Sequence, residues 1–448
     1  MKKGEKIFFL GIIIYSFAII YASEQFAFIN QGDFSRTTGK FLSSNVQFLL
    51  EWPLLENPSM PHPWEVYSVF LWLISKISKL FTNTFVLAIS SVVQKIILLF
   101  IVYCLLKRLI SSKTIFVFGY IVSAAILLAP HNSAIFKSFY PESFFAIGLM
   151  ALVAGIYSYK ENDRPILIIM GSVLCGLSKV QFFYIPAMAV VVLIFLNGKN
   201  NFQGIKKYIY VLMLIQAACF LPLANNKYSQ INYYHALYLG PYVVMSDPEL
   251  DEANLSEEKR LCIGVDAWGN KLTGQGGSVI QSNHKTCVDE ESGSIWKIFA
   301  TYIKFPSVFA RMVAYSAETH FTTKYFHVDK NYLYQVSTAN LGSVPIALQK
   351  ISNAREFFPP WSILIFFLPI VFAISIVKKG KARLGLSCFF LLSIIFTQLI
   401  ISLLGEGVRD LSKHLYGAQF SIDLIMVFTF FHGLALCEGM KDEAQQNS

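Results

Sequence analysis

The sequence predicts an all-α polytopic membrane protein with about ten transmembrane helices and a large polar insertion of mixed structure. Of its 448 residues, 54% are hydrophobic and only 15% are charged, whereas a soluble domain carries about a quarter charged residues. The mean hydropathy is correspondingly high, at +0.51. The formal net charge of +9 does not indicate nucleic acid, because the basic residues gather in short connections between apolar stretches.

Ten apolar runs are long enough to cross a bilayer, for which a helix needs about 20 residues. They cover residues 7–23, 83–106, 113–130, 143–159, 164–179, 180–197, 207–223, 361–377, 384–404 and 417–436. If all ten cross, the basic connections between them fall on one side of the membrane, together with both termini. The positive-inside rule makes that side the cytoplasm.

The apolar stretch 64–80 is interpreted as an amphipathic helix lying in the outward-facing interface. It contains Lys76 and Lys79, and counting it as a span would turn every later basic connection outward. A tilted additional span is the alternative that remains open. Residues 7–23 show no convincing small-residue cleavage site, so we expect a retained span and not a signal peptide.

This topology divides the chain into three parts. Residues 1–223 form an N-terminal transmembrane module that includes the first outward loop, 24–82. Residues 224–360 form a large outward segment, and residues 361–448 hold the last spans around an outward loop at 405–417. Loops as long as the second segment usually form a small domain or carry a function.

Cys262 and Cys287 are the only cysteines outside the predicted spans and their edges. Their spacing suits a disulfide in an oxidising compartment, with two unpaired thiols as the alternative. No cysteine and histidine spacing is typical of a zinc site.

Two acids stand at outward positions next to the membrane. Asp33 follows the first span, and Glu142 lies at the outer edge of the fourth. If the two converge on one cavity, they supply carboxylates for acid and base chemistry. A solvated loop acid is the alternative for either residue alone.

Two lysines are candidate ligands for a lipid phosphate. Lys179 lies at the outward tip between the fifth and sixth spans, and Lys95 lies inside the second span. Ionisable residues at membrane depth are costly and usually functional. The alternative is that both side chains extend to the interface.

The densest polar cluster lies between the last two spans. Arg409, Lys413 and His414 are candidates for binding a phosphate or diphosphate. Glu406 and Asp410 would bind sugar hydroxyls or hold these basic residues in place. A purely structural ion-pair network is the alternative.

Several stretches are similar to one known family. They are Gly-Asp-Phe-Ser-Arg at 32–36, the stretches at 234–240 and 325–328, the run containing Asp-Ala-Trp-Gly-Asn-Lys at 262–271, Gly-Glu-Gly at 405–407, and Arg-Asp-Leu-Ser-Lys-His-Leu at 409–415. Nearly end to end, the chain resembles the serotype-converting O-antigen glucosyltransferases of enteric bacteria and their prophages. Its architecture also resembles the GT-C class of polyprenyl-phosphate-sugar-dependent transferases, which place an acid in the first outward loop and interfacial helices before the second span.

The resemblance implies a reaction in the periplasm, at the bacterial inner membrane. Glucose carried on undecaprenyl phosphate is transferred to a sugar of the O-antigen repeat unit, which modifies the lipopolysaccharide. The partners implied are the lipid-linked donor, the glycan acceptor, a flippase and a donor-charging enzyme, with no nucleic acid.

The roles that follow are a hypothesis. Asp33 acts as general base on the acceptor hydroxyl, and Lys179 with Arg409 or Lys413 stabilises the leaving phosphate. Glu142 positions the acceptor or supports Asp33, and would be a ligand if the reaction uses a divalent cation. The residues expected to bind substrate are Arg36, Glu406, Asp410, Asp266, Asn270 and Trp268, whose ring would stack on a sugar, whereas His235 and His327 are expected to be structural.

Two alternatives stay open. The first is a GT-C transferase that uses another sugar or acceptor, because cavity shape selects the donor. The second is a transporter or flippase of lipid-linked sugars. The sequence shows no internal repeat of the kind from which many transporters are built, and its polar clusters gather on the outward side.

Overall fold

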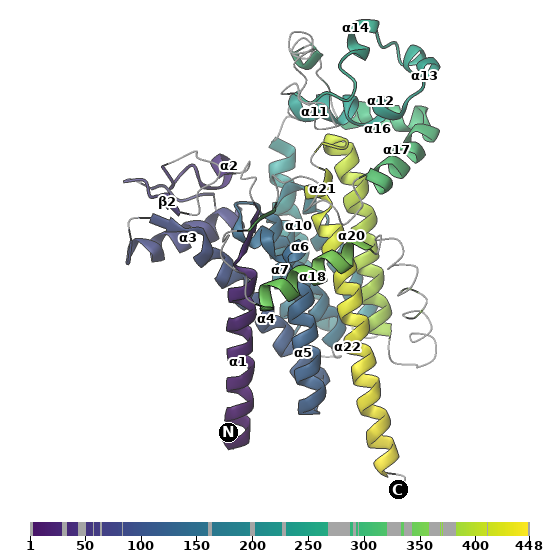
Figure 1. Ribbon diagram of the computed structural model, residues 1–448. Coiled ribbons are helices and arrows are strands. Elements are labelled where there is room, and N and C mark those ends of the chain that lie inside the picture. The colour runs from purple at the N-terminus through teal and green to yellow at the C-terminus, as the bar shows by residue number, and fades with distance from the viewer. Residues whose placement is uncertain are drawn as a thin grey trace. The chain divides into compact units, whose positions relative to one another are not determined.

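The structure is a computed structural model, and its described part of the chain is mostly helical (Figure 1). It describes residues 3–28, 34–43, 51–56, 58–62, 65–82, 84–159, 164–197, 202–225, 230–267, 287–289, 293, 295–319, 333–335, 343–357, 368, 370, 382–409 and 411–446. The chain divides into two compact units. Unit 1 comprises residues 1–220, 326–392 and 420–448, and unit 2 comprises 221–325 and 393–419.

Five helical segments of the described chain are long and apolar enough to cross a membrane. They are Glu5–Ser23 within α1 (Lys3–Ser23), Leu87–Leu109 (α4), Val180–Asn197 (η2, Val180–Phe182, with α9, Ile185–Asn197), Arg383–Glu406 within α20 (Ala382–Glu406) and Tyr416–Ala435 within α22 (Tyr416–Gln446). They match five of the ten predicted spans. In unit 1, the first residues of α1 and the last residues of α22 lie at the same end (Figure 1).

The other predicted spans have different outcomes. α7 (Glu142–Ser158) and α8 (Ile166–Gly176) are shorter apolar helices, and α8 is only about 16 Å long, against about 30 Å for the bilayer core. A third helix, α10 (Phe202–Asn225), covers the predicted span 207–223. The predicted span 361–377 lies almost entirely outside the described residues. The number of ten spans therefore stays a prediction.

The predicted span 113–130 corresponds to α5 (Lys113–Leu127) and ends at a sharp bend. α5 is followed by α6 (Pro130–Ser133) and the 3-10 helix η1 (Ala134–Lys137), and the two parts meet at a bend of 64°. The residue before a proline avoids the helical region, and Ala129 accordingly has the extended angles φ −59° and ψ 147°. Every residue from 127 to 159 is buried, so the irregular backbone between α5 and α7 is covered by protein.

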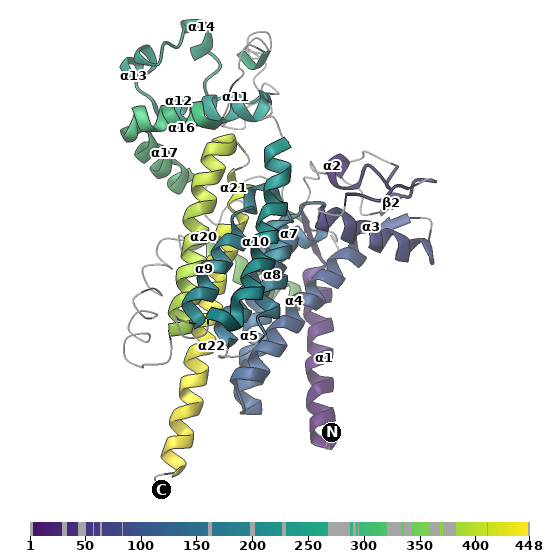
Figure 2. The ribbon, with the colours of Figure 1, turned by 180° about the vertical axis from the view of Figure 1, so that it is seen from behind.

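α7 and α8 approach each other unusually closely. A Cβ atom on Gly171 would lie 2.5 Å from the carbonyl oxygen of Gly148 and from the backbone nitrogen of Leu152. Small residues allow this approach between apolar helices, and it helps to bury α7 along its whole length. Figure 2 shows α8 beside α9 on the rear of unit 1.

The predicted outward loop, 24–82, belongs to unit 1. It contains β1 (Phe26–Phe28), α2 (Phe34–Thr38) and β2 (Glu51–Pro53), and β3 (Thr84–Val86) follows it directly. β2 pairs antiparallel with β3, and β1 pairs antiparallel with β4 (Leu333–Gln335). The Trp52 ring stacks on Phe34 with centroids 4.0 Å apart, and Phe139 packs against both rings.

The stretch predicted as an interfacial helix forms α3 (Val66–Lys79). Its 14 residues span about 21 Å, too little to cross the bilayer core. Tyr67 and Leu71 belong to its buried stripe, whereas Leu73 and Ile77 are about half exposed on the opposite face. α3 runs across the direction of α1 (Figure 1). These features support an interfacial position, which stays a prediction.

Unit 2 is built from short helices. They are α11 (Gln230–Tyr238), α12 (Pro241–Val244), α13 (Asp247–Glu252), α14 (Glu257–Arg260), α16 (Ile295–Lys304), α17 (Pro306–Thr319) and α21 (Leu411–His414), with the adjoining ends of α10, α20 and α22. The predicted disulfide between Cys262 and Cys287 is confirmed. α18 (Ser343–Phe357), although within the predicted large outward segment, belongs to unit 1.

Candidate functional site

The buried segment from Pro130 to Glu142, here called the 130–142 segment, concentrates the ionisable groups of unit 1. Its side chains take part in three separate buried ion clusters, which reach α1, α4, α18, α22 and the start of η2. Breaks in membrane helices often lie at binding sites. The 130–142 segment is therefore the candidate functional site.

The first cluster, here called the Glu24 cluster, joins Glu24, Lys95 and Lys137. The Lys95 Nζ atom lies 2.5 Å from Glu24 Oε1, and the Lys137 Nζ atom lies 3.3 Å from Glu24 Oε2. Lys137 also donates a hydrogen bond of 2.8 Å to the backbone carbonyl of Glu24. Lys95 was predicted from its sequence position, and the structure pairs it with an acid.

Glu24 is expected to stay ionised in this setting. Burial raises the pKa of its carboxyl. The charges of Lys95 and Lys137, together with hydrogen bonds from Lys95 and Ser91, lower the pKa by more than burial raises it. The pKa of Glu24 is therefore held below its ordinary value.

The second cluster joins two predicted site residues, Glu142 and Lys179. Their Oε1 and Nζ atoms lie 2.6 Å apart, and the Glu142 side chain is fully buried while Lys179 is 12% exposed. Glu142 is the first residue of α7, where the helix dipole favours a carboxylate. The structure thus brings together an acid and a cation from separate predicted outward connections.

The third cluster was missed by the sequence analysis. Asp423, inside α22, accepts hydrogen bonds of 2.9 Å from Asn132 and 2.8 Å from Arg355, and its Oδ2 atom lies 2.9 Å from His131 Nε2. The signal was present, because an aspartate within a predicted span is as unusual as Lys95.

The third cluster superficially resembles a hydrolase triad, since Ser352 Oγ lies 2.8 Å from His131 Nδ1. However, Arg355 occupies the second oxygen of Asp423, and the backbone N–H of His131 donates to the Ser352 hydroxyl. All of these side chains are buried. The cluster is best explained as a tie that fixes the start of the 130–142 segment to α18 and α22.

In unit 2, the predicted residues of the 405–417 loop pair with protein groups. Arg409 lies 3.2 Å from Asp266, and His414 lies 3.2 Å from Glu406. These contacts agree with the structural alternative for this loop, in which acids hold the basic residues. Lys413 lies in α21, one residue before His414.

The 405–417 loop is fastened to the end of α11. The backbone N–H of Val408 donates a hydrogen bond of 2.7 Å to Leu239, and Gly407 has φ +61°. A Cβ on Gly407 would lie 2.2 Å from the Leu239 carbonyl oxygen, so only glycine fits this contact. Nearby, His235 Nε2 accepts from the backbone N–H of Ala267, as expected for a structural histidine. Residues from four of the stretches that carry the family resemblance thus meet within unit 2.

Several residues with a predicted catalytic, binding or structural role lie outside the described residues. They are Asp33, Trp268, Asn270, His327, Asp410 and the side chain of Arg36. Their proposed roles stay predictions.

The divalent cation suggested as an option stays untested, because Asp33 lies outside the described residues. Within them, no three His, Cys, Asp or Glu side chains lie together as ligands. Glu142 faces an ammonium group instead of a second carboxylate.

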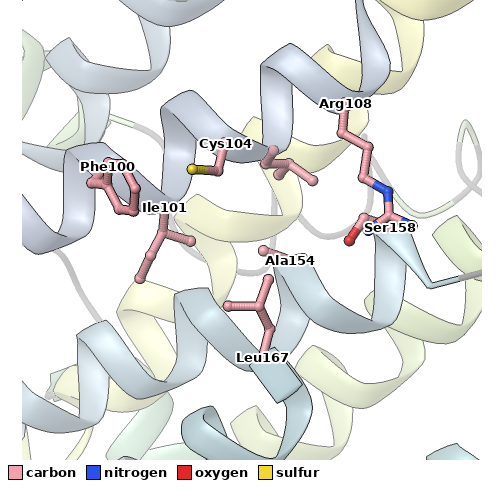
Figure 3. Close-up of a pocket in the computed structure, with 8 residues that line it drawn as sticks. Phe100, Ile101, Cys104, Arg108, Ala154, Ser158 and Leu167 are labelled. Carbon is pink, nitrogen blue, oxygen red and sulfur yellow. The ribbon is translucent and has the colours of Figure 1, made fainter. Parts of the chain in front are cut away.

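A small cavity of about 140 Å³ lies between α4, α7 and α8 (Figure 3). Its lining is apolar except at one end, where Arg108 and Ser158 lie. Arg108 lies about 20 Å along α4 from Lys95, so this cavity is separate from the clusters of the 130–142 segment.

Comparison with known proteins identifies a class of membrane domain. The family model described as the YfdI N-terminal transmembrane domain matches residues 24–448, and the chain belongs to this family. It is 25% identical over 427 residues to the Escherichia coli (strain K12) protein named "Uncharacterized protein YfdI". The matched region covers 92% of this chain and 93% of that protein. No solved structure matches the chain. The family and the apolar helices together support the predicted membrane protein class.

Proposed function

We propose that the protein is an inner-membrane glycosyltransferase of the GT-C type that moves glucose from undecaprenyl phosphate glucose to an O-antigen repeat unit. The reaction would take place at the periplasmic face, as in prophage-linked serotype conversion, with both termini in the cytoplasm. A flippase and a donor-charging enzyme would supply the lipid-linked sugar. The family resemblance described above and the buried acid and cation of the 130–142 segment support this proposal.

The observation that carries the proposal is the packing of Phe34 on Phe139. Their ring centroids are 5.1 Å apart, and both side chains are buried. Phe34 directly follows Asp33 in the chain, and Phe139 precedes Glu142 by three positions. This contact ties the chain neighbours of the two predicted acids to each other, which supports their convergence on one site.

The proposed reaction is a displacement with inversion at the anomeric carbon. Asp33 accepts the proton of the acceptor hydroxyl as its oxygen forms a bond to that carbon. The bond from the anomeric carbon to the phosphate oxygen breaks, and the lipid phosphate leaves with the bonding electrons. Lys179 offsets the charge on the leaving phosphate, while Glu142 holds the Lys179 ammonium in place.

The test is the replacement Asp33→Asn, with glucosylation measured on O-antigen from cells and in membrane vesicles supplied with undecaprenyl phosphate glucose. We expect glucosyl transfer to be lost while expression and membrane insertion persist. Glu56→Gln, an exposed acid of the same loop, is the matched control and should leave transfer unchanged. A fully active Asp33→Asn protein would remove Asp33 from the mechanism.

The alternatives predict different results in the same vesicles. A transferase for another sugar would use a different donor in a panel of polyprenyl phosphate sugars. A transporter of lipid-linked sugars would move the donor across the bilayer without forming a glycosidic product. Lys95 and Asp423, which lie inside two of the described spans, are paired with charged or titratable side chains of the protein, which favours transfer over transport.

A further inference from the structure

By formal charge, the Glu24 cluster contains two buried cations and one carboxylate. Lys95 is fully buried, the Lys137 side chain is 6% exposed, and the Glu24 side chain is 11% exposed. Two ammonium groups therefore share one carboxylate. Burying a charge without an opposite charge is costly, so a cluster of this composition favours one further anion.

The polar neighbours of the Glu24 cluster do not supply that anion. Ser91 donates its hydroxyl to Glu24 Oε1, and the Gln94 amide nitrogen lies 3.1 Å from the Ser90 hydroxyl oxygen. The buried Oε1 atom of Gln94 accepts no hydrogen bond in the described structure. Both side chains are neutral, so the second ammonium charge stays without a counter-charge among the described residues.

One edge of the Glu24 cluster is better suited to a ligand than the other. On the Lys95 side, Glu24 Oε1 makes a short ion pair with a fully buried partner. On the Lys137 side, Oε2 makes only the longer contact of 3.3 Å and no hydrogen bond, and both side chains keep some exposure. A ligand would therefore reach Lys137 before Lys95.

The position of the Glu24 cluster matches that of a lipid headgroup. Glu24 directly follows the candidate span Glu5–Ser23, at the start of the first outward loop. Lys137 ends η1 within the 130–142 segment, five positions before Glu142. An anion at Lys137 would thus lie in the same buried segment as Glu142, one of the residues of the proposed reaction.

We propose that the Glu24 cluster is a phosphate-binding site, in which Lys137 takes the phosphate of the polyprenyl-linked donor and Glu24 is a resident carboxylate that occupies Lys137 until the donor arrives. The choice of a polyprenyl phosphate as the source rests on the proposed function. A phosphate suits the site because its several oxygens can accept from Lys137 while its charge supplies the missing anion. No bond is made or broken in this step.

This inference predicts opposite effects for two neutralising substitutions. Lys137→Gln removes the ligand and should weaken phosphate binding by about tenfold or more, the usual effect of losing one charge-assisted hydrogen bond. Glu24→Gln removes the competing carboxylate and should tighten binding. A purely structural ion cluster would not give these opposite changes in phosphate binding.

The experiment uses the purified full chain in phosphatidylcholine nanodiscs, titrated with undecaprenyl phosphate. Inorganic phosphate and phosphatidylglycerol are the comparison ligands, and Lys107→Gln, at the other end of α4, is the matched control. Thermal unfolding without ligand shows whether each variant folds. If Glu24→Gln does not fold, Glu24→Asp replaces it, because the shorter carboxylate withdraws from Lys137 and should also tighten binding.

Weakened binding in Lys137→Gln with tightened binding in the Glu24 variant supports the site. Equal binding by Lys137→Gln and wild type, or weaker binding in the Glu24 variant, overturns it. Equal competition by phosphatidylglycerol overturns the assignment of the ligand to a polyprenyl phosphate. If phosphate binding depends on Lys137 but no glucosyl transfer is detected, the phosphate site stands and the proposed transferase function is rejected. If glucosyl transfer occurs and Lys137→Gln does not change it, the transferase function stands and the phosphate site is rejected.

Discussion

At the scale of single residues, the buried pair of Glu142 and Lys179 gives a direct test of the structure through its effect on stability. Removing one partner of a buried ion pair leaves the other charge unpaired and costs about 3–5 kcal/mol. We therefore expect Glu142→Gln and Lys179→Gln each to lower the thermal unfolding midpoint markedly. The double variant should recover part of the loss, because no unpaired charge remains.

The control for this pair lies in unit 2. Glu252 and Lys304 are 3.3 Å apart but more than half exposed, so Glu252→Gln should change stability by about 1 kcal/mol or less. Additive effects of the two substitutions at Glu142 and Lys179 would show that they do not act as a pair.

The sequence identified several charged residues but not their partners. Lys95 stood out because it lies within an apolar run, yet Glu24 is separated from it by 71 positions. Asp423 carried the same signal within its own run and was overlooked. Such pairings depend on which spans pack together, and local hydropathy contains no information about that.

At the scale of elements, the contact between α13 and α17 makes a prediction about pH. A hydrogen bond from Arg311, with further ones from Ser246, lowers the pKa of Glu249 from 4.5 to about 2. A lowered pKa in the folded state means that this contact stabilises fully above about pH 4.5 and is lost as the pH falls towards 2. Thermal unfolding should therefore show a stability difference between wild type and Glu249→Gln that shrinks across this window. A difference independent of pH would contradict the role of the carboxylate charge.

The elements also show why some predictions succeeded. The lysines of 64–80 indicated an amphipathic helix, and α3 forms within that stretch with one buried face, while its position relative to the membrane stays a prediction. The continuous apolar run 113–130 hid the break before Pro130, although a proline at that point was a visible signal. Composition predicted the apolar segments well, whereas the local geometry of the chain decided where a helix ends.

At the scale of the whole molecule, the disulfide constrains the unfolded chain. It also indicates whether residues 262 and 287 lie in an oxidising compartment. Cys262 and Cys287 are 25 positions apart, and closing a loop of this size stabilises by about 3 kcal/mol. We expect Cys262→Ser to lower the unfolding midpoint. Alkylation of denatured protein from cells should label both thiols only after reduction, as expected in an oxidising compartment. Labelling without reduction would contradict the bridge and weaken the predicted outward position of 224–360.

At this scale the predicted membrane-protein class is supported, whereas the topology stays a prediction. Five apolar helices and a family of transmembrane domains agree with a polytopic protein. The side on which each connection lies still depends on the distribution of basic residues. That distribution is a statistical signal, so it orients the chain without specifying the contacts between spans.

The ties of the 130–142 segment have a consequence for biogenesis. His131 and Asn132 are synthesised almost 300 positions before Asp423, their buried partner. Until α22 is inserted, His131 and Asn132 lack this partner. Chaperones or the insertion machinery would then have to shield these polar side chains. Nascent chains arrested before α22 should therefore be degraded quickly, which makes completion of the C-terminus a quality checkpoint for the N-terminal half.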